Sequence, residues 1–226
     1  SSSNILSLGF FQNSRASIYT SYTIHTPRSG DCDLVTPLCG DCSSRTILEP
    51  SIGRGDLIAF IKERLPDVSF DKYEIDTSIE LLPGIIRSQV VYGDFMTQTI
   101  TKKYKTIIGN PPYIRTKTGN LYIDFIEKCY RLLENGGEMI FIVPSDFFKL
   151  TSASKLLTEL LSNGSFTHIF HPHNEHLFDN ACIDILVFRY QLGEPVSQVL
   201  YNDVLMNTNC NNGLVVFDKK QGKDVS

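Results

Sequence analysis

At Thr106–Tyr113 the chain reads TIIGNPPY, an apolar run that ends abruptly in a rigid polar turn. The segment Tyr104–Ile108 is short, rich in β-branched and aromatic side chains, and followed by glycine and two prolines, which predicts a buried parallel strand. Each proline fixes its own φ and pushes the residue before it to extended geometry. We therefore expect the oxygens of Asn110 and Pro111 to be held in fixed directions at the strand end.

This turn offers acceptors beside an aromatic face: the side-chain oxygen of Asn110, the carbonyl of Pro111 and the ring of Tyr113. Two acceptors on the N–H bonds of an aromatic amine would localise its lone pair and favour attack on an electrophile, while Tyr113 could hold the ring by stacking. For the tetrapeptide alone, an ordinary strand-ending turn with a packed tyrosine is the alternative. The predicted catalytic residues are Asn110, Pro111, Pro112 and Tyr113.

Composition is that of a globular chain, with 226 residues, 42% hydrophobic, 20% charged and a net charge of −4. It is long enough for one sizeable α/β domain and is not generally basic, so any grip on nucleic acid must be local or supplied elsewhere. We find no apolar run of membrane-spanning length and no basic signal region at Ser1–Asn4. We therefore expect a cytoplasmic chain without a membrane span, trimmed or processed at its N-terminus.

Metal binding is not expected from the cysteines and histidines. Cys39 and Cys42 form a single C-x-x-C motif with Cys32 upstream, and no second pair completes a tetrahedral site. The histidines between His168 and His176 are better explained as a solvated group in one loop than as metal ligands.

The rest of the chain predicts alternating strands and helices. Strands are expected over 46–49, 69–75, 90–92, 138–143, 166–170 and 182–190, helices over 57–65, 120–133 and 149–161, and short extended segments over 196–217. This order is typical of an α/β fold with a parallel sheet.

Three further motifs follow the predicted strands. The glycine turn Gly53–Gly55 follows the first strand, Glu74 and Asp76 end the second about 20 residues later, and Asp94 with Phe95 follows the third. Each signal is weak alone, but open α/β sheets bind ligands at their carboxyl edge, where Asn110 is also expected. A nucleoside cofactor beside an amine-binding turn indicates a transferase.

Together these motifs resemble the catalytic domain of the adenine-N6 DNA methyltransferases of restriction-modification systems, in the gamma motif order and with the NPPY motif. The resemblance runs from about Thr26 to Tyr190. It implies S-adenosyl-L-methionine as cofactor and a Rossmann-like methyltransferase fold. That fold is a mostly parallel seven-stranded sheet with an antiparallel last strand and helices on both faces.

The resemblance also implies roles for individual residues. Thr26 would lie near the methionine carboxylate, although Thr36 competes for that register, and Arg54 departs from the usual glycine motif. Glu74 would bind the ribose, Asp94 the cofactor adenine. The implied cofactor-binding residues are Thr26, Glu49, Pro50, Ser51, Gly53, Glu74, Asp94, Phe95 and Phe125.

The implied reaction is direct methyl transfer to a flipped-out adenine in DNA. The base would stack on Tyr113 and on Phe178, which lies in the loop before the last strand, and present its amino group to Asn110 and Pro111. No strong general base is required, because the amine can lose its proton after attack.

We expect three regions: 1–45 as an N-terminal segment with the methionine-binding motif, 46–190 as the catalytic domain, and 191–226 as its C-terminal extension. Family members of this order usually carry a target-recognition domain after the catalytic one. Since no basic module precedes Ser226, we expect that domain to be absent from this chain or replaced by a partner subunit.

Three alternatives are open. RNA adenine methyltransferases use closely related motifs, and the same tetrapeptide serves glutamine methyltransferases that act on release factors. A catalytically silent nucleic-acid or partner-binding module is the alternative of another class. Against the release-factor reading stand Phe178 and the segment Ile142–Ser145, which resemble the DNA group, and intact Asp94 and Asn110 argue against a silent module.

Overall fold

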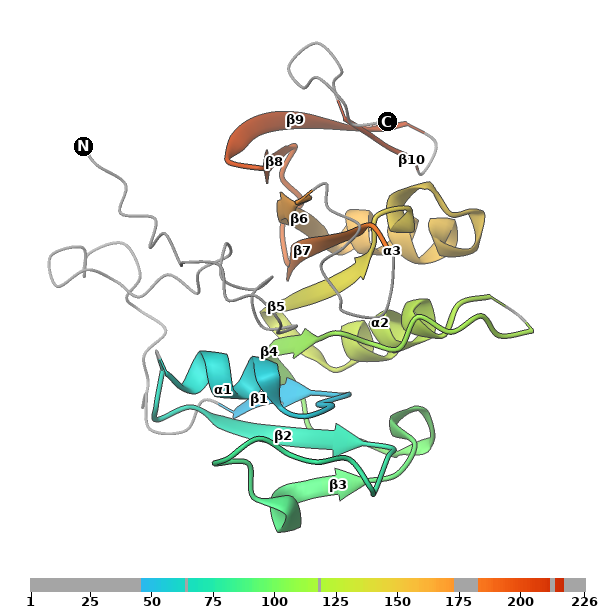
Figure 1. Cartoon of the computed structure of the whole chain (residues 1–226). Helices are drawn as coiled ribbons and strands as arrows, with labels where there is room; N and C mark the ends of the chain where they lie inside the picture. The colour runs from blue at the N-terminus through green and yellow to red at the C-terminus, as the bar shows by residue number, and fades with distance from the viewer. Residues whose placement is uncertain (1–45, 64, 118, 173–182, 212–213, 218–226) are drawn as a thin grey trace, which may run out of the picture.

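A computed structural model describes residues 46–63, 65–117, 119–172, 183–211 and 214–217 (Figure 1). The expected N-terminal segment 1–45, with Thr26, and the loop residue Phe178 lie outside these described residues, as do Cys39 and Cys42.

The described strands form one sheet in the order β10-β9-β8-β6-β7-β5-β4-β1-β2-β3 (Figure 1). The strands are β1 Thr46–Glu49, β2 Ser69–Glu74, β3 Val90–Tyr92, β4 Tyr104–Gly109, β5 Leu133–Pro144, β6 Gly164–Phe170, β7 Ile185–Leu192, β8 Gln198–Tyr201, β9 Val204–Asn211 and β10 Leu214–Phe217. The helices are α1 Asp56–Lys62, α2 Leu121–Arg131 and α3 Ser154–Asn163, with 3-10 turns η3 Arg87–Gln89, η4 Phe95–Thr97, η5 Phe147–Lys149 and η6 Thr151–Ala153.

The first seven strands have the expected topology. β1 pairs in parallel with β2 and β4, β2 with β3, and β4 with β5. β7 lies between β5 and β6 and is antiparallel to both, which confirms the antiparallel last strand. The sheet is larger than the seven strands expected, because β8 pairs with β6 and β9 and β10 follow it at that edge.

Two hydrophobic layers lie on opposite faces of the sheet. Successive side chains in a strand point to opposite faces, and the neighbours Ile107 and Ile108 belong to different layers. Leu57 and Ile58 of α1 cover the Ile108 face, whereas α2 and α3 cover the Ile107 face. Ile107 and Ile108 are both fully buried, so the apolar run of β4 is a central strand, as predicted.

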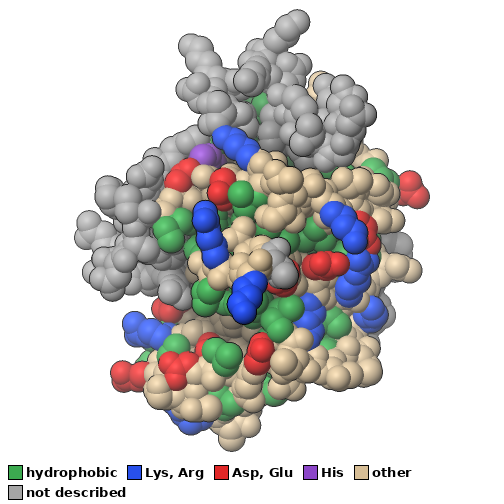
Figure 2. Space-filling model, turned by 90° about the vertical axis from the view of Figure 1, so that its right-hand side faces the viewer, with side chains coloured by type: hydrophobic (Ala, Val, Ile, Leu, Met, Phe, Trp, Pro, Cys, Tyr) green, Lys and Arg blue, Asp and Glu red, His purple; other side chains and the backbone are tan. Residues whose placement is uncertain are grey.

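The strand order reverses between β1 and β4, and ligands of open α/β folds bind at such a point, beyond the carboxyl strand ends. The arrows of β2, β3 and β4 point to the right in Figure 1. Figure 2 views the molecule from that side and so faces the carboxyl edge of these strands.

The helix predicted over 149–161 begins later than expected. Residues Phe147–Lys149 and Thr151–Ala153 form two 3-10 turns, and α3 starts only at Ser154. Leu150 between them is extended, with ψ of 127°. This break lets both Phe147 and Ala153 become fully buried, so tertiary packing overrides the local helical pattern.

No helix within the described ranges has both the length and the apolar character needed to span a membrane.

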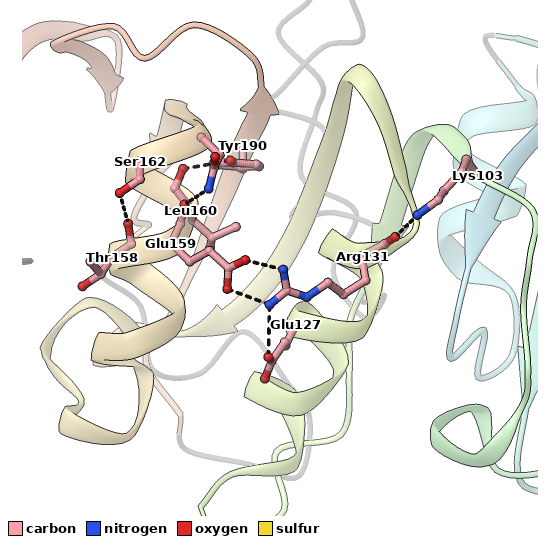
Figure 3. Close-up of polar contacts among 9 residues, drawn as sticks. Lys103, Glu127, Arg131, Thr158, Glu159, Leu160, Ser162 and Tyr190 are labelled. Atoms are coloured by element: carbon pink, nitrogen blue, oxygen red, sulfur yellow. Dashed lines mark hydrogen bonds and ion pairs between the residues drawn. The ribbon is translucent and has the colours of Figure 1, made fainter.

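Polar contacts connect α3 to its neighbours (Figure 3). The buried Tyr190 hydroxyl of β7 donates a 2.8 Å hydrogen bond to the Leu160 carbonyl of α3. The Arg131 guanidinium of α2 makes two hydrogen bonds to the Glu159 carboxylate and a 3.5 Å ion pair with Glu127. The first contact lies inside the core and the second lies at the surface, so the two should differ in their effect on stability.

We expect Tyr190→Phe to lower the free energy of unfolding by about 1 kcal/mol, because a buried carbonyl loses its donor. Arg131→Gln should cost less than this, because the guanidinium is 51% exposed and exposed ion pairs contribute little. Urea unfolding of both variants measures the difference. A larger loss for Arg131→Gln than for Tyr190→Phe would contradict this interpretation.

Candidate functional site

The turn after β1 depends on glycine at two positions. Gly53 has φ of 56° and Gly55 has φ of 95°, both in the left-handed region that favours glycine. A Cβ on Gly55 would also lie 2.8 Å from the Ile85 side chain. Arg54 between them is exposed, so the departure from the usual motif leaves the turn intact.

Glu74 at the end of β2 fixes this turn. Its carboxylate accepts hydrogen bonds from the Gly53 N–H at 2.8 Å and from the Asp76 N–H at 2.9 Å. Each carboxylate oxygen can accept more than one hydrogen bond, so the group can still accept bonds from a ligand. The predicted ribose acid and the predicted glycine turn are therefore in direct contact.

Glu49 at the end of β1 is a fully buried acid. Neither of its carboxyl oxygens has a hydrogen-bond partner among the described residues. Burial raises the pKa of Glu49 well above its ordinary value, and the nearby Glu74 acts in the same direction. The Ser51 backbone amide only partly offsets this rise in pKa. Such a group is costly to bury unless it is neutral or paired, and the raised pKa favours the neutral carboxyl.

Asp94 follows β3 and caps the turn η4. Its Oδ1 accepts a 2.9 Å hydrogen bond from the Met96 N–H, and no described residue donates to its Oδ2. Phe95 beside it is buried and stacks on Phe125 of α2 with the ring centroids 5.3 Å apart. Lys128 of α2 holds this turn, because its Nζ donates a 2.5 Å hydrogen bond to the Phe95 carbonyl. The two phenylalanines expected near the cofactor thus pack against each other.

Ile75 was not singled out by sequence reasoning. It lies between Glu74 and Asp76 at the carboxyl edge, and its side chain is 68% exposed. A large aliphatic side chain exposed between two acids at a strand end was the signal in the sequence that could have identified it.

At the predicted catalytic turn, the Tyr113 hydroxyl donates to the Asn110 side chain. Its oxygen lies 2.7 Å from Asn110 Oδ1 and 3.1 Å from the Ile142 carbonyl. Asn110 in turn accepts at its backbone carbonyl a 3.3 Å hydrogen bond from the Ser51 hydroxyl. The turns after β1 and β4 are therefore in contact.

These bonds orient the acceptors of the turn. An amide oxygen has two acceptor sites, so Asn110 Oδ1 can receive a second hydrogen bond while Tyr113 holds it. Pro111 is buried, and no described residue donates to its carbonyl. Tyr113 and Asn110 are half-buried rather than sealed in the core, as a ligand-binding role requires.

Tyr122 of α2 packs against the Tyr113 ring. Its ring meets that of Tyr113 edge-on at 5.9 Å, and that of Phe147 at 6.1 Å. The Tyr122 hydroxyl is buried without a hydrogen-bond partner among the described residues. Desolvation and the nearby Asp146 raise the pKa of this phenol above its usual value.

The predicted residues that the structure describes gather at one edge. Eleven of them follow or end the strands β1 to β4, and the twelfth lies on α2; they are Glu49, Pro50, Ser51, Gly53, Glu74, Asp94, Phe95, Asn110, Pro111, Pro112 and Tyr113, and Phe125. No cluster of His, Cys, Asp or Glu suited to a metal ion occurs in the described ranges. His171 instead binds Asp184 at 2.7 Å.

Comparison with known proteins points to methyltransferases. The model of the Eco57I restriction-modification methylase family matches residues 91–178, which include the turn Asn110–Tyr113. The type II methyltransferase M.HincII of Haemophilus influenzae is 31% identical over 176 residues, covering 68% of this chain and 34% of that protein. M.CvrRI of Paramecium bursaria Chlorella virus XZ-6E is 31% identical over 192 residues, covering 76% of this chain and 50% of that protein.

Solved structures share the fold. A Listeria monocytogenes protein described as a class I S-adenosylmethionine-dependent methyltransferase has a TM-score of 0.58 and 17% identity, covering 70% of this chain and 58% of that one. A type I restriction-modification methyltransferase subunit from Streptococcus thermophilus has a TM-score of 0.56 and 15% identity, covering 80% of this chain and 47% of that one.

The chain has the Rossmann-like fold of the S-adenosylmethionine-dependent methyltransferases, as expected, and its sequence relatives are methyltransferases of restriction-modification systems. The cofactor of this fold class is S-adenosyl-L-methionine, in agreement with the prediction from the sequence. The chain spans only about one third to one half of the curated relatives compared above.

The buried Glu49 generates a prediction for the dependence of stability on pH. Its folded pKa lies above the ordinary value of 4.5, so stability is full below that value and falls as pH rises through the folded pKa. Glu49→Gln cannot ionise and should escape this loss, which has a limiting slope of about 1.4 kcal/mol per pH unit. Urea unfolding of both proteins between about pH 4.5 and 8 measures it.

The exposed Glu134→Gln serves as a control for changing one carboxyl to an amide. The free energy of unfolding of Glu134→Gln should change with pH in the same way as that of the unaltered protein. If the profile of Glu49→Gln did the same, Glu49 would not be the buried acid that the structure describes.

Proposed function

We propose that this chain contains the catalytic part of a DNA methyltransferase of a restriction-modification system, which transfers a methyl group from S-adenosyl-L-methionine to N6 of adenine. The observation that carries the proposal is the contact between the turns after β1 and β4. Ser51 of the glycine turn binds Asn110, whose side-chain oxygen is oriented by Tyr113. A cofactor turn and an amine-binding turn are thus side by side.

The residues at the edge fit the cofactor. Glu74 and Asp94 keep acceptor capacity where ribose hydroxyls and an adenine amino group need it, and Ile75 offers an exposed apolar surface beside them. Glu49 supplies a buried carboxyl without a described partner near the glycine turn. In this proposal Gly53 and Ser51 contact the cofactor from the turn itself, and Thr26 holds its methionine end.

The chemistry needs little from the protein beyond position and charge. When bound, S-adenosyl-L-methionine supplies an electrophilic methyl group on a sulfonium. Asn110 Oδ1 and the Pro111 carbonyl accept the two N–H bonds of the target amine and keep its nitrogen lone pair directed at that electrophile. The proton leaves the amine after the C–N bond forms, so a strong base at the site is not required.

The base itself must leave the double helix to reach this turn. Extrusion costs a few kcal/mol and is offset by stacking and hydrogen bonding in the pocket. Tyr113 supplies one stacking surface, and its ring is backed by Tyr122 at 5.9 Å. Phe178 supplies the second surface from the loop between β6 and β7.

We assign the methionine-binding segment to 1–45 and the catalytic domain to 46–190. Residues 191–226 extend the catalytic domain, and β8 supports this because it continues the same sheet next to β6. A target-recognition domain or a partner subunit completes the enzyme. DNA is preferred over RNA or a release-factor glutamine because the relatives are type II methyltransferases.

We expect Asn110→Ala to lower methyl transfer by at least about a hundredfold, the usual effect of removing one preorganised polar group at the reacting atoms. Binding of S-adenosyl-L-methionine, followed by calorimetry, should change little. The assay is transfer of tritiated methyl groups to mixed-sequence DNA at low salt, followed by base analysis of the product.

Asn163→Ala, at the exposed C-terminal end of α3, is the matched control and should transfer methyl groups like the unaltered chain. The same assay with RNA and with a release factor tests the alternatives. Labelling of either in preference to DNA would overturn the substrate proposed here, and a chain that does not bind the cofactor would overturn the enzyme itself.

A further inference from the structure

A short hairpin follows the catalytic turn directly and projects from the carboxyl edge. The loop between β4 and α2 extends outward at the right of Figure 1. From Ile114 to Lys117 every side chain is exposed, and Ile114 is 56% exposed. The proposed function assigns no role to this segment, because there the amine is held by Asn110 and Pro111 and the base by Tyr113 and Phe178.

The hairpin is held by backbone hydrogen bonds. The Leu121 N–H donates to the Ile114 carbonyl at 2.9 Å, and the Thr116 N–H donates to the Gly119 carbonyl at 2.8 Å. Arg115 and Asn120 form an antiparallel bridge. The side chains of Ile114–Lys117 are therefore presented from a backbone that is paired with residues 119–121.

Two cations on this hairpin have no partner among the residues that the structure describes. Neither Arg115 nor Lys117 makes a hydrogen bond or ion pair with a described residue, whereas Lys128 is bound to three backbone carbonyls. Lys149, in the loop after β5, is also exposed without a described side-chain partner. Exposed cations that stay unpaired are available for an anionic partner.

Charge is divided along the carboxyl edge. The ends of β2 and β3 carry the acids Glu74, Asp76 and Asp94. The described parts of the loops after β4 and β5 carry three cations, Arg115, Lys117 and Lys149, and one acid, Asp146. Figure 2 shows Lys and Arg side chains next to hydrophobic ones near the middle of this face. A chain with a net charge of −4 is thus locally cationic beside the catalytic turn.

We propose that the exposed arm Ile114–Lys117 of this hairpin binds the sugar-phosphate backbone of the target strand at the flipped nucleotide, with Arg115 and Lys117 each contacting a phosphate. This inference rests on the proposed function, because it takes the Tyr113 ring as the place where the base stacks. It adds a contact surface that fixes the strand while the base is out of the helix.

Distance along the chain supports this partner over an acidic protein. Arg115 lies two residues after Tyr113, so their Cα atoms are at most about 7 Å apart. A nucleotide stacked on Tyr113 keeps its own phosphates attached, which brings anionic groups to the hairpin without further assumptions. Ile114 between the ring and the cations offers an apolar surface for the sugar, and mixed apolar and cationic contact is typical of strand binding.

The test compares the full chain with the double variant Arg115→Gln/Lys117→Gln in DNA methylation. The Michaelis constant for DNA should rise at least about tenfold at 50 mM salt, with kcat within about twofold. The slope of log affinity against log salt should become shallower by about 1.8, since each duplex phosphate contact contributes about 0.9. Calorimetry with S-adenosyl-L-methionine should show unchanged binding, which establishes that the variant is folded.

The control Lys62→Gln/Lys105→Gln removes the same charge elsewhere, because Lys62 ends α1 and Lys105 begins β4 at the opposite edge. It should leave both the Michaelis constant and the salt slope unchanged. An equal effect from the two double variants would mean that net charge alone matters and would overturn the inference. So would a loss of kcat without a change in the Michaelis constant.

A DNA probe with neutral methylphosphonates on both sides of the target adenine gives an independent test. The unaltered chain should bind it at least about tenfold more weakly than normal DNA, and the hairpin variant should bind both alike. If the chain methylates DNA but discriminates neither probe nor variant, only the hairpin inference fails. If it transfers no methyl group to DNA even with a target-recognition domain or partner subunit supplied, the proposed function fails first.

Discussion

The parallel pairing of β1 with β4 is the constraint on which the site depends. Leu48 and Ile107 are register partners, both fully buried, at the point where the strand order reverses. Because the strands run in the same direction and end at the same level, the turns that follow them must meet. This register brings Ser51 close enough to donate a hydrogen bond from its hydroxyl to the Asn110 carbonyl. A slip of one residue would disturb the packing of side chains in both hydrophobic layers and shift the two turns apart.

The second constraint is that polar groups are buried at this edge without being fully satisfied. The Glu49 carboxyl has no hydrogen-bond partner among the described residues, and the Glu74 carboxylate accepts a hydrogen bond from Gly53 of the glycine turn. Buried polar groups of this kind reduce stability, and proteins keep them where a ligand completes the network. The turn after β1 is specialised in another way, because Gly53 and Gly55 adopt positive φ and a Cβ on Gly55 would lie 2.8 Å from the Ile85 side chain. The carboxyl edge is therefore less stable than a purely apolar one would be.

Much of this arrangement follows from local sequence. The run before Asn110 predicts β4 because a short apolar segment followed by glycine and two prolines has few other stable forms. The later start of α3 could not be predicted, since it depends on the burial of Phe147 against Phe188 from a strand forty residues away in sequence, with ring centroids 5.6 Å apart. The hydrogen bond from the Tyr113 hydroxyl to Asn110 Oδ1 could not be predicted from the sequence either, because it depends on side-chain rotamers. Local pattern identifies the elements, and packing between them decides their ends.

The net charge of the chain was a poor guide to its surface for a related reason. A sum over residues treats Lys128 and Lys117 alike, yet Lys128 is bound by three carbonyls and Lys117 has no described partner. These three hydrogen bonds engage the Lys128 ammonium within the protein, and partial burial also lowers its pKa. Only cations that are both exposed and unpaired can release counterions from a phosphate backbone. The recognition of an anionic strand proposed above therefore depends on where exposed, unpaired cations lie rather than on the net charge, and Arg115 and Lys117 lie close to the turn proposed to hold the base.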